Sequence, residues 1–300
     1  MDDIAAVAAA DQNARHWTFA TPGPAAPGSP EHYAMFTALL EATYNPYKPA
    51  VLDWPKLEPD ARQRITSLPI WDIAVQTENK AGARIEFYSQ TVPQPELRAA
   101  LVHMAGEERR HRDVLARLVA AYGIPVKPDD YYALPNDAEW GFLVTGYSEC
   151  IDSFFAFGLF EMARRSGFFP VDLVETFEPV IQEETRHIIF FVNFVAWKRA
   201  NMKWWWRILF ELKVAAVWGF LIWERIGIAK DVDGLEGGDA NFTVTGSEAL
   251  SGDMDPARLI DMCLIENDRR MAGYDSRLTR PQVAPFLARV ARLFIRPKRS

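Results

Sequence analysis

Two segments of the sequence repeat nearly the same five letters. They are EERRH at 107–111 and EETRH at 183–187. The chain has only five histidines, so two of the five lie in the same short context. A single Glu-x-x-His pair on a helix is usually a surface feature, but chance seldom produces the same context twice. The repetition therefore favours a shared chemical role for the two segments.

The spacing within each segment suits a metal ion. Residues three apart on a helix project from the same side, so Glu108 pairs with His111 and Glu184 with His187. One carboxylate and one imidazole together suit iron or manganese, whereas a softer ion would favour thiolates. Two such pairs on facing helices, completed by one further glutamate from each of two other helices, form the ligand set of di-iron and di-manganese bundles.

The first additional carboxylate is predicted from a helical hairpin that turns near Val92. Glu78 precedes this turn by nearly as many positions as Glu108 follows it. At a rise of about 1.5 Å per residue, Glu78 comes within about 5 Å of the level of the Glu108 and His111 pair. Glu86 lies much closer to the turn and falls well short of that level.

The second additional carboxylate has two candidates, on a hairpin that turns near Phe168. Glu149 lies as far before the turn as His187 lies after it, and Asp152 lies as far before it as Glu184 lies after it. We prefer Glu149 because a longer side chain bridges two ions more easily. Asp152 is the alternate ligand.

Four long helices are predicted to carry these residues. Apolar periodicity and the stop signals Gly123 and Gly167 place them at about 69–89, 96–122, 138–165 and 170–200, with a fifth at 202–226 and more helix from Pro256 onward. Residues 1–30 are rich in Ala, Pro and Gly, which favours a loosely docked arm. The predicted fold is all-α, with an N-terminal arm and irregular segment over 1–65, a four-helix di-metal bundle over 66–201, and additional helices packed on the bundle over 202–300.

This pattern resembles the ferritin-like di-iron carboxylate superfamily over about residues 68–200. The doubled Glu-x-x-His motif carries the resemblance, and the separations within each hairpin look most like those of demethoxyubiquinone hydroxylases and R2-like ligand-binding oxidases. The resemblance implies a ferritin-like bundle in which Glu107 and Glu183 orient the histidine of the opposite motif. Salt bridges from these two glutamates to Arg110 or Arg186 are the alternative interpretation.

The resemblance also implies a function. A pair of iron ions, or a mixed Mn/Fe pair, would react with dioxygen, and the protein would be an oxidase, hydroxylase or desaturase that acts on a hydrophobic small molecule and takes electrons from a donor. A non-catalytic protein of iron handling or storage is one alternative. A rubrerythrin-like peroxide scavenger is another, although Cys150 and Cys263 are too few for the Cys-rich iron site that such proteins usually carry.

Composition narrows the partners and the compartment. The net charge of −7 argues against nucleic acid as a partner, and the lack of a signal-like start favours the cytoplasm.

The apolar segment 204–223 contains Arg207, Glu211 and Lys213. One charge near a helix centre costs roughly 2.5–3.5 kcal/mol on insertion into a membrane, so we expect a buried or interfacial helix. The tryptophans at 204–206 and the basic, amphipathic run 287–300 suggest contact with a membrane surface. A homodimer is also compatible with the sequence.

Overall fold

The computed structural model describes residues 4–45, 54–126, 132–231 and 255–295, and in this part of the chain every regular element is a helix. The predicted all-α fold is confirmed. The helices are α1 (Ile4–Arg15), α2 (Pro30–Ala42), α3 (Pro59–Thr66), α4 (Trp71–Ser89), α5 (Pro95–Tyr122), α6 (Ala138–Ser166), α7 (Val171–Asn201), α8 (Trp204–Asp231), α10 (Pro256–Met271) and α11 (Val283–Phe294).

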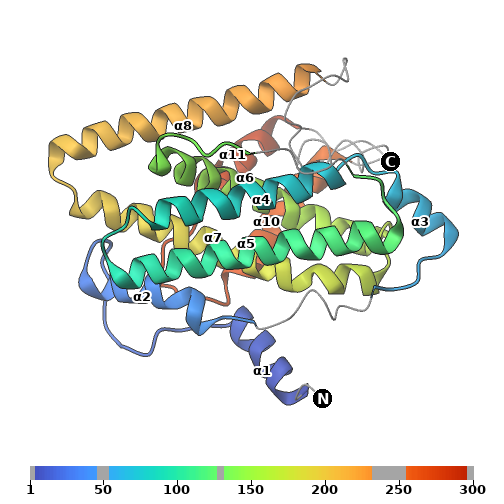
Figure 1. The fold of residues 1–300 in the computed structure, drawn as a ribbon, viewed down its shortest axis with the longest axis horizontal. Helices are drawn as coiled ribbons and strands as arrows, with labels where there is room; N and C mark the ends of the chain where they lie inside the picture. The colour runs from blue at the N-terminus through green and yellow to red at the C-terminus, as the bar shows by residue number, and fades with distance from the viewer. Residues whose placement is uncertain (1–3, 46–53, 127–131, 232–254, 296–300) are drawn as a thin grey trace.

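Helices α4 to α7 form a four-helix bundle, and their bounds lie close to those expected from the sequence. α4 packs on α5 and α6, and α7 packs on α5 and α6 (Figure 1). The stops have the predicted cause, because Gly123 and Gly167 end α5 and α6 with a φ of 67°, a left-handed conformation that glycine adopts without strain. Asp137 caps the start of α6 by accepting from the backbone N–H of Trp140. α7 continues through Pro179 without ending.

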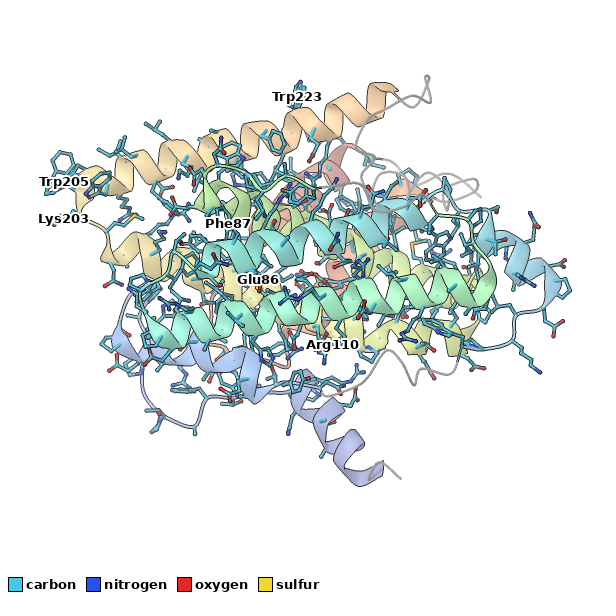
Figure 2. All side chains as sticks on the ribbon, in the orientation of Figure 1. Glu86, Phe87, Arg110, Lys203, Trp205 and Trp223 are labelled. Atoms are coloured by element: carbon cyan, nitrogen blue, oxygen red, sulfur yellow. The ribbon has the colours of Figure 1, made fainter. Side chains whose placement is uncertain are left out.

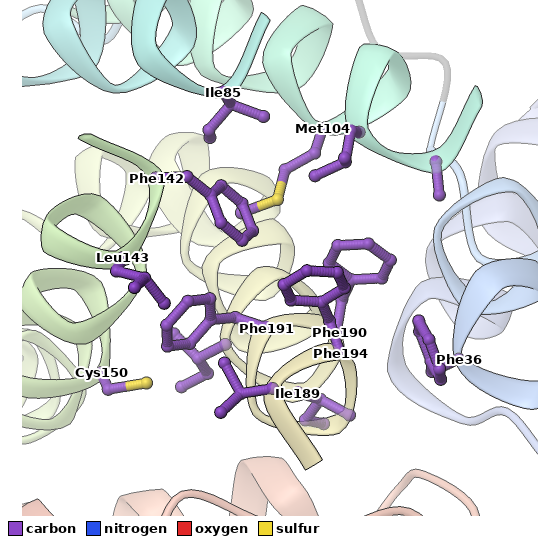
Figure 3. Packing of buried hydrophobic residues seen from close by; sticks show 14 of the residues in the cluster. Phe36, Ile85, Met104, Phe142, Leu143, Cys150, Ile189, Phe190, Phe191 and Phe194 are labelled. Carbon is purple, nitrogen blue, oxygen red and sulfur yellow. The ribbon is translucent and has the colours of Figure 1, made fainter. Parts of the chain in front are cut away.

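The bundle interior consists of two apolar clusters. The larger one includes Ile85, Met104, Phe142 and Phe191, which meet between the four helices in Figure 3. The smaller one gathers at the opposite end, around residues such as Leu118. Along α5 the larger cluster ends at Ala105 and the smaller begins at Val114, so the 107–111 motif lies between them. The polar residues of this stretch therefore form a layer across the middle of the bundle.

The N-terminal segment differs from the loosely docked arm expected from its composition. Residues 4–15 form α1, and α2 packs on α5 and α7 with buried residues such as Phe36. The stretch between them is held by Arg277, which donates hydrogen bonds to the carbonyls of Phe19, Thr21 and Gly23. The prediction of a loose arm is wrong for this part of the chain, because contacts with the distant C-terminal segment supply the stability that the local sequence lacks.

The helices α8, α10 and α11 cover α6. α8 and α10 pack directly on α6, and α11 packs on α10 and α6. At Gly158, α6 approaches α10 so closely that a Cβ would overlap Cys263. Within the described residues, no helix combines the length and apolarity needed to cross a bilayer.

Candidate metal centre

Side chains from three of the bundle helices converge in the polar layer. One ligand atom from each of Glu108, His111, Glu184 and His187 lies within 4.8 Å of the other three. His187 Nδ1 is 2.7 Å from Glu108 Oε1, and His111 Nδ1 is 3.0 Å from Glu184 Oε1. Glu78 of α4 joins them, with Oε2 3.6 Å from His111 Nδ1. The two motif copies therefore face each other, as their repetition suggested.

The outer nitrogen of each histidine is fixed by a glutamate from the opposite motif. His111 Nε2 lies 2.8 Å from Glu183 Oε2, and His187 Nε2 lies 2.8 Å from Glu107 Oε2. A carboxylate can only accept a hydrogen bond, so each Nε2 carries the proton. In a neutral imidazole this leaves a lone pair on Nδ1, the nitrogen that faces the other carboxylates.

Among the side chains of the candidate ligands, five atoms are buried without a well-aligned hydrogen bond in the described part of the chain, although each histidine Nδ1 lies close to a carboxylate oxygen. They are His111 Nδ1, His187 Nδ1, Glu108 Oε1 and both carboxylate oxygens of Glu149. Buried polar atoms are rarely left unsatisfied, because desolvation without a partner costs about 1–3 kcal/mol each. All five are nitrogen or oxygen atoms of the types that ligate iron and manganese. The donor set therefore fits a metal site, and the ligand roles themselves stay a prediction.

Two arginines neutralise the outer glutamates. Arg186 Nη2 lies 3.0 Å from Glu107 Oε1 and 3.2 Å from Glu183 Oε1. Arg110 donates to Glu183 as well, by a short contact. Glu107 and Glu183 therefore form both the salt bridges to arginine and the hydrogen bonds to histidine that were considered as alternatives. Each carboxylate directs one oxygen to an arginine and the other to a histidine. Glu107 consequently has a pKa well below its usual range: burial would raise it, but the charge of Arg186 and the hydrogen bonds of His103 and His187 outweigh burial.

The inner carboxylates crowd one another. Burial raises the pKa of Glu78 to about 8, and burial together with the charges of Glu108 and Glu184 raises the pKa of Glu149 well above its ordinary value. Burial also acts to lower the pKa of His111, but the neighbouring carboxylates of Glu108, Glu183 and Glu184 outweigh it and raise the pKa well above its usual value. So many acids in one layer need positive charge, which can come from protons or from cations.

The first hairpin aligns as its residue count predicts. Glu78 reaches the cluster, whereas Glu86, two turns further along α4, pairs with Arg109 at 2.7 Å near the surface (Figure 2). Gly82 allows the two helices to approach between these positions, since a Cβ there would lie 3.3 Å from Glu108 Cβ and from the Ala105 carbonyl oxygen.

The structure separates the two candidates on α6. Asp152 points to α8, where its Oδ1 lies 3.0 Å from Arg225 Nη2, and it accepts a hydrogen bond from Ser148. Glu149 instead interacts electrostatically with Glu108, Glu184 and His187. This geometry favours Glu149 as the additional carboxylate, because its oxygens have no competing partner among the described residues.

The layer is covered unequally on its sides. His111, His187 and Glu108 are at most 1% exposed, whereas the side chains of Glu78 and Glu184 retain 21% and 15% of their accessible surface. Ser153 of α6 also donates to Glu184 Oε2 at 3.3 Å. Among these side chains, Glu78 and Glu184 are therefore the ones that retain accessible surface.

Some participants were not predicted from the sequence. His103 Nε2 lies 3.3 Å from Glu107 Oε1, and Thr43, the residue that caps the end of α2, places its carbonyl 2.7 Å from Arg186 Nη1. His103 stands one turn before Glu107 on the same helix, so its i, i+4 spacing was a usable signal. The contact of the Thr43 carbonyl could not be predicted, because every residue has a backbone carbonyl and the sequence does not show which one meets Arg186.

Comparisons of this chain with protein-family models, with curated proteins and with solved structures find no match. The fold and the site therefore define the class of protein by themselves. It is an all-α helical bundle with a glutamate–histidine cluster able to hold metal in its polar layer.

Proposed function

We propose that this protein is an oxygen-dependent di-iron oxidoreductase that acts on a hydrophobic small molecule. The observation that supports it most directly is the paired histidine geometry. His111 and His187 each present Nδ1 to a shared group of carboxylates while a glutamate of the opposite helix holds Nε2. Such an outer hydrogen bond is the usual support of a metal-bound imidazole.

Charge balance favours two cations over one. The layer contains six carboxylates. The positive charges of Arg110 and Arg186 offset two of the six negative charges. When all six carboxylates are ionised and both histidines are neutral, as ligation of metal by all of them requires, four negative charges remain, and two divalent ions match them. The six residues that would hold the ions are Glu78, Glu108, His111, Glu149, Glu184 and His187.

A bound pair of iron ions, or a mixed Mn/Fe pair, would supply redox chemistry with dioxygen, using electrons from an external donor. The chain's own residues orient the metal ligands and enclose the site. Glu107 and Glu183 keep each Nε2 protonated and each ring in place. Arg186 holds Glu107 and Glu183 by ion pairs. The apolar clusters on either side of the layer exclude water from it.

Elemental analysis of the purified chain tests the metal assignment. We expect about two iron ions, or one manganese and one iron, per chain, and a transient absorption band when oxygen is added to the reduced protein. Glu184→Gln and His187→Ala should lose most of the bound metal. Glu86→Gln is the matched control, since this glutamate lies on α4 but pairs with Arg109 away from the cluster.

Full metal content in His187→Ala would contradict the assignment. Native mass and a peroxide assay separate the oxidoreductase from its alternatives, because iron storage requires a large hollow assembly and a peroxide scavenger would consume hydrogen peroxide faster than dioxygen. Either result would replace the proposed activity without removing the metal site.

A further inference from the structure

The outward face of α8 is apolar over its whole described length. Its members include Trp204, Trp205, Leu209, Leu212, Ile222 and Trp223, all of which are exposed. Leu212 is 62% exposed and Trp223 is 70% exposed, and Trp223 projects away from the bundle in Figure 2. The small residues between them, Ala215, Ala216 and Gly219, are exposed too. A soluble protein normally buries such a face.

Three charged residues of α8 turn toward the bundle instead. Glu211 pairs with Arg199 of α7 at 2.8 Å, and Lys213 reaches Asp137 at 2.7 Å. Arg225 pairs with Asp152 of α6. These three ion pairs fix the rotation of α8 about its axis. The apolar side chains on the opposite side therefore face outward.

The charge around this face is one-sided. Between residues 203 and 225 the exposed residues are eleven apolar or glycine positions and two basic ones, Lys203 and Arg207. Lys203 Nζ lies over the Trp205 ring, 5.4 Å from its centroid. The chain as a whole carries a net charge of −7. A basic border beside exposed tryptophans, on an acidic protein, complements an anionic lipid surface.

The width of the face favours a bilayer over a second helix. At 100° per residue, the exposed apolar positions from Trp204 to Trp223, apart from Trp206, cover an arc of about 140°, whereas a two-helix seam uses a narrower stripe. A helix lying in the bilayer interface buries a broad face to a depth of about 5–10 Å. α11 has the same character, since its exposed residues are apolar apart from Arg289, and it also packs on α6.

We propose that the outward face of α8 docks this protein on an anionic membrane surface, with the helix lying in the interface plane. Docking would place the bundle beside a source of hydrophobic molecules. It does not depend on the proposed metal chemistry, so the metal-depleted variant His187→Ala should bind lipid as the parent protein does.

Vesicle sedimentation of the full chain tests the proposal. We expect binding to phosphatidylcholine vesicles that contain phosphatidylglycerol and weaker binding to phosphatidylcholine alone. Leu212→Glu should lower binding at least about tenfold, because it places a charge in the part of the helix that would enter the lipid interface. Val102→Glu on α5, where Val102 is 48% exposed, should bind normally. Lys203→Gln with Arg207→Gln should lower only the phosphatidylglycerol-dependent part, by roughly tenfold.

Three results would overturn the proposal. One is a parent protein that binds neither kind of vesicle. Another is a Leu212→Glu variant that binds as the parent does. The third is a parent protein that is a dimer and ignores vesicles, with Leu212→Glu converting it to a monomer, since the face would then be an interface between two copies of this chain.

Discussion

In the motif copies on α5 and α7, Glu107 and Glu183 make equivalent contacts with the opposite histidines. The arginines at the same motif position, Arg110 and Arg186, lie in different surroundings. Glu107 and Glu183 each bind the opposite histidine at the same distance of 2.8 Å. Arg186, however, is fully buried and bonds to Glu107, Glu183 and the Thr43 carbonyl. Arg110 keeps 11% of its side-chain surface and reaches out to Tyr44.

The difference follows from the position of each helix. α7 is packed by α1, α2, α5, α6 and α10, whereas α5 contacts α2, α4 and α7. An identical residue type at an identical motif position is therefore interior on one helix and peripheral on the other. The comparison teaches that the bonds from Glu107 and Glu183 to the opposite histidines are symmetric and that the supporting arginines are not.

Replacing the two arginines should produce the largest contrast. Arg186→Met leaves Glu107 without its closest arginine and removes a buried cation from Glu183, and breaking a buried ion pair costs about 3–5 kcal/mol. Arg110→Met should cost about 1 kcal/mol, because a partly exposed pair gains less. Chemical denaturation of the metal-loaded proteins measures both. Equal losses of unfolding free energy would show that the arginines are equivalent after all.

The two acids of α6 should differ next. Glu149→Gln should weaken the binding of at least one metal ion by about a hundredfold or more, because its oxygens have no other partner among the described residues. Asp152→Asn should bind metal normally and only loosen α8, through its bond to Arg225. Metal titration decides between them, and the reverse outcome would make Asp152 the ligand.

The symmetric positions should respond alike. Glu107→Gln and Glu183→Gln should each lower metal affinity by about 10- to 100-fold, the usual effect of losing the outer bond of a ligating histidine. Competition with a chelator gives the affinities. Effects that differ by much more than this range would mean that the asymmetry of the arginines extends to the histidines.

The smallest effect is expected outside the layer. Glu86→Ala removes a surface ion pair with Arg109, in which both side chains are nearly half exposed, and should change the unfolding free energy by less than about 0.5 kcal/mol. Its metal content should equal that of the parent. A loss of metal here would show that the first hairpin is aligned differently from the structure.

Much of the bundle could be predicted from the sequence. The bounds of α4 to α7 follow from apolar periodicity and from glycine stops, and the level of Glu78 follows from counting residues on either side of the turn near Val92. These features depend on the rise per residue of a helix, which is the same in every protein. The loosely docked arm was the main error, because composition describes a segment's own tendency and not the partners that it meets.

The sequence by itself determined which residues share a helix face, and so brought Glu108 beside His111 and Glu184 beside His187. Only the tertiary structure decided that Arg186 is buried, that Asp152 turns to Arg225 and that the apolar face of α8 points outward. The reason is physical: helix periodicity acts between residues a few positions apart, whereas burial depends on which distant segments pack alongside.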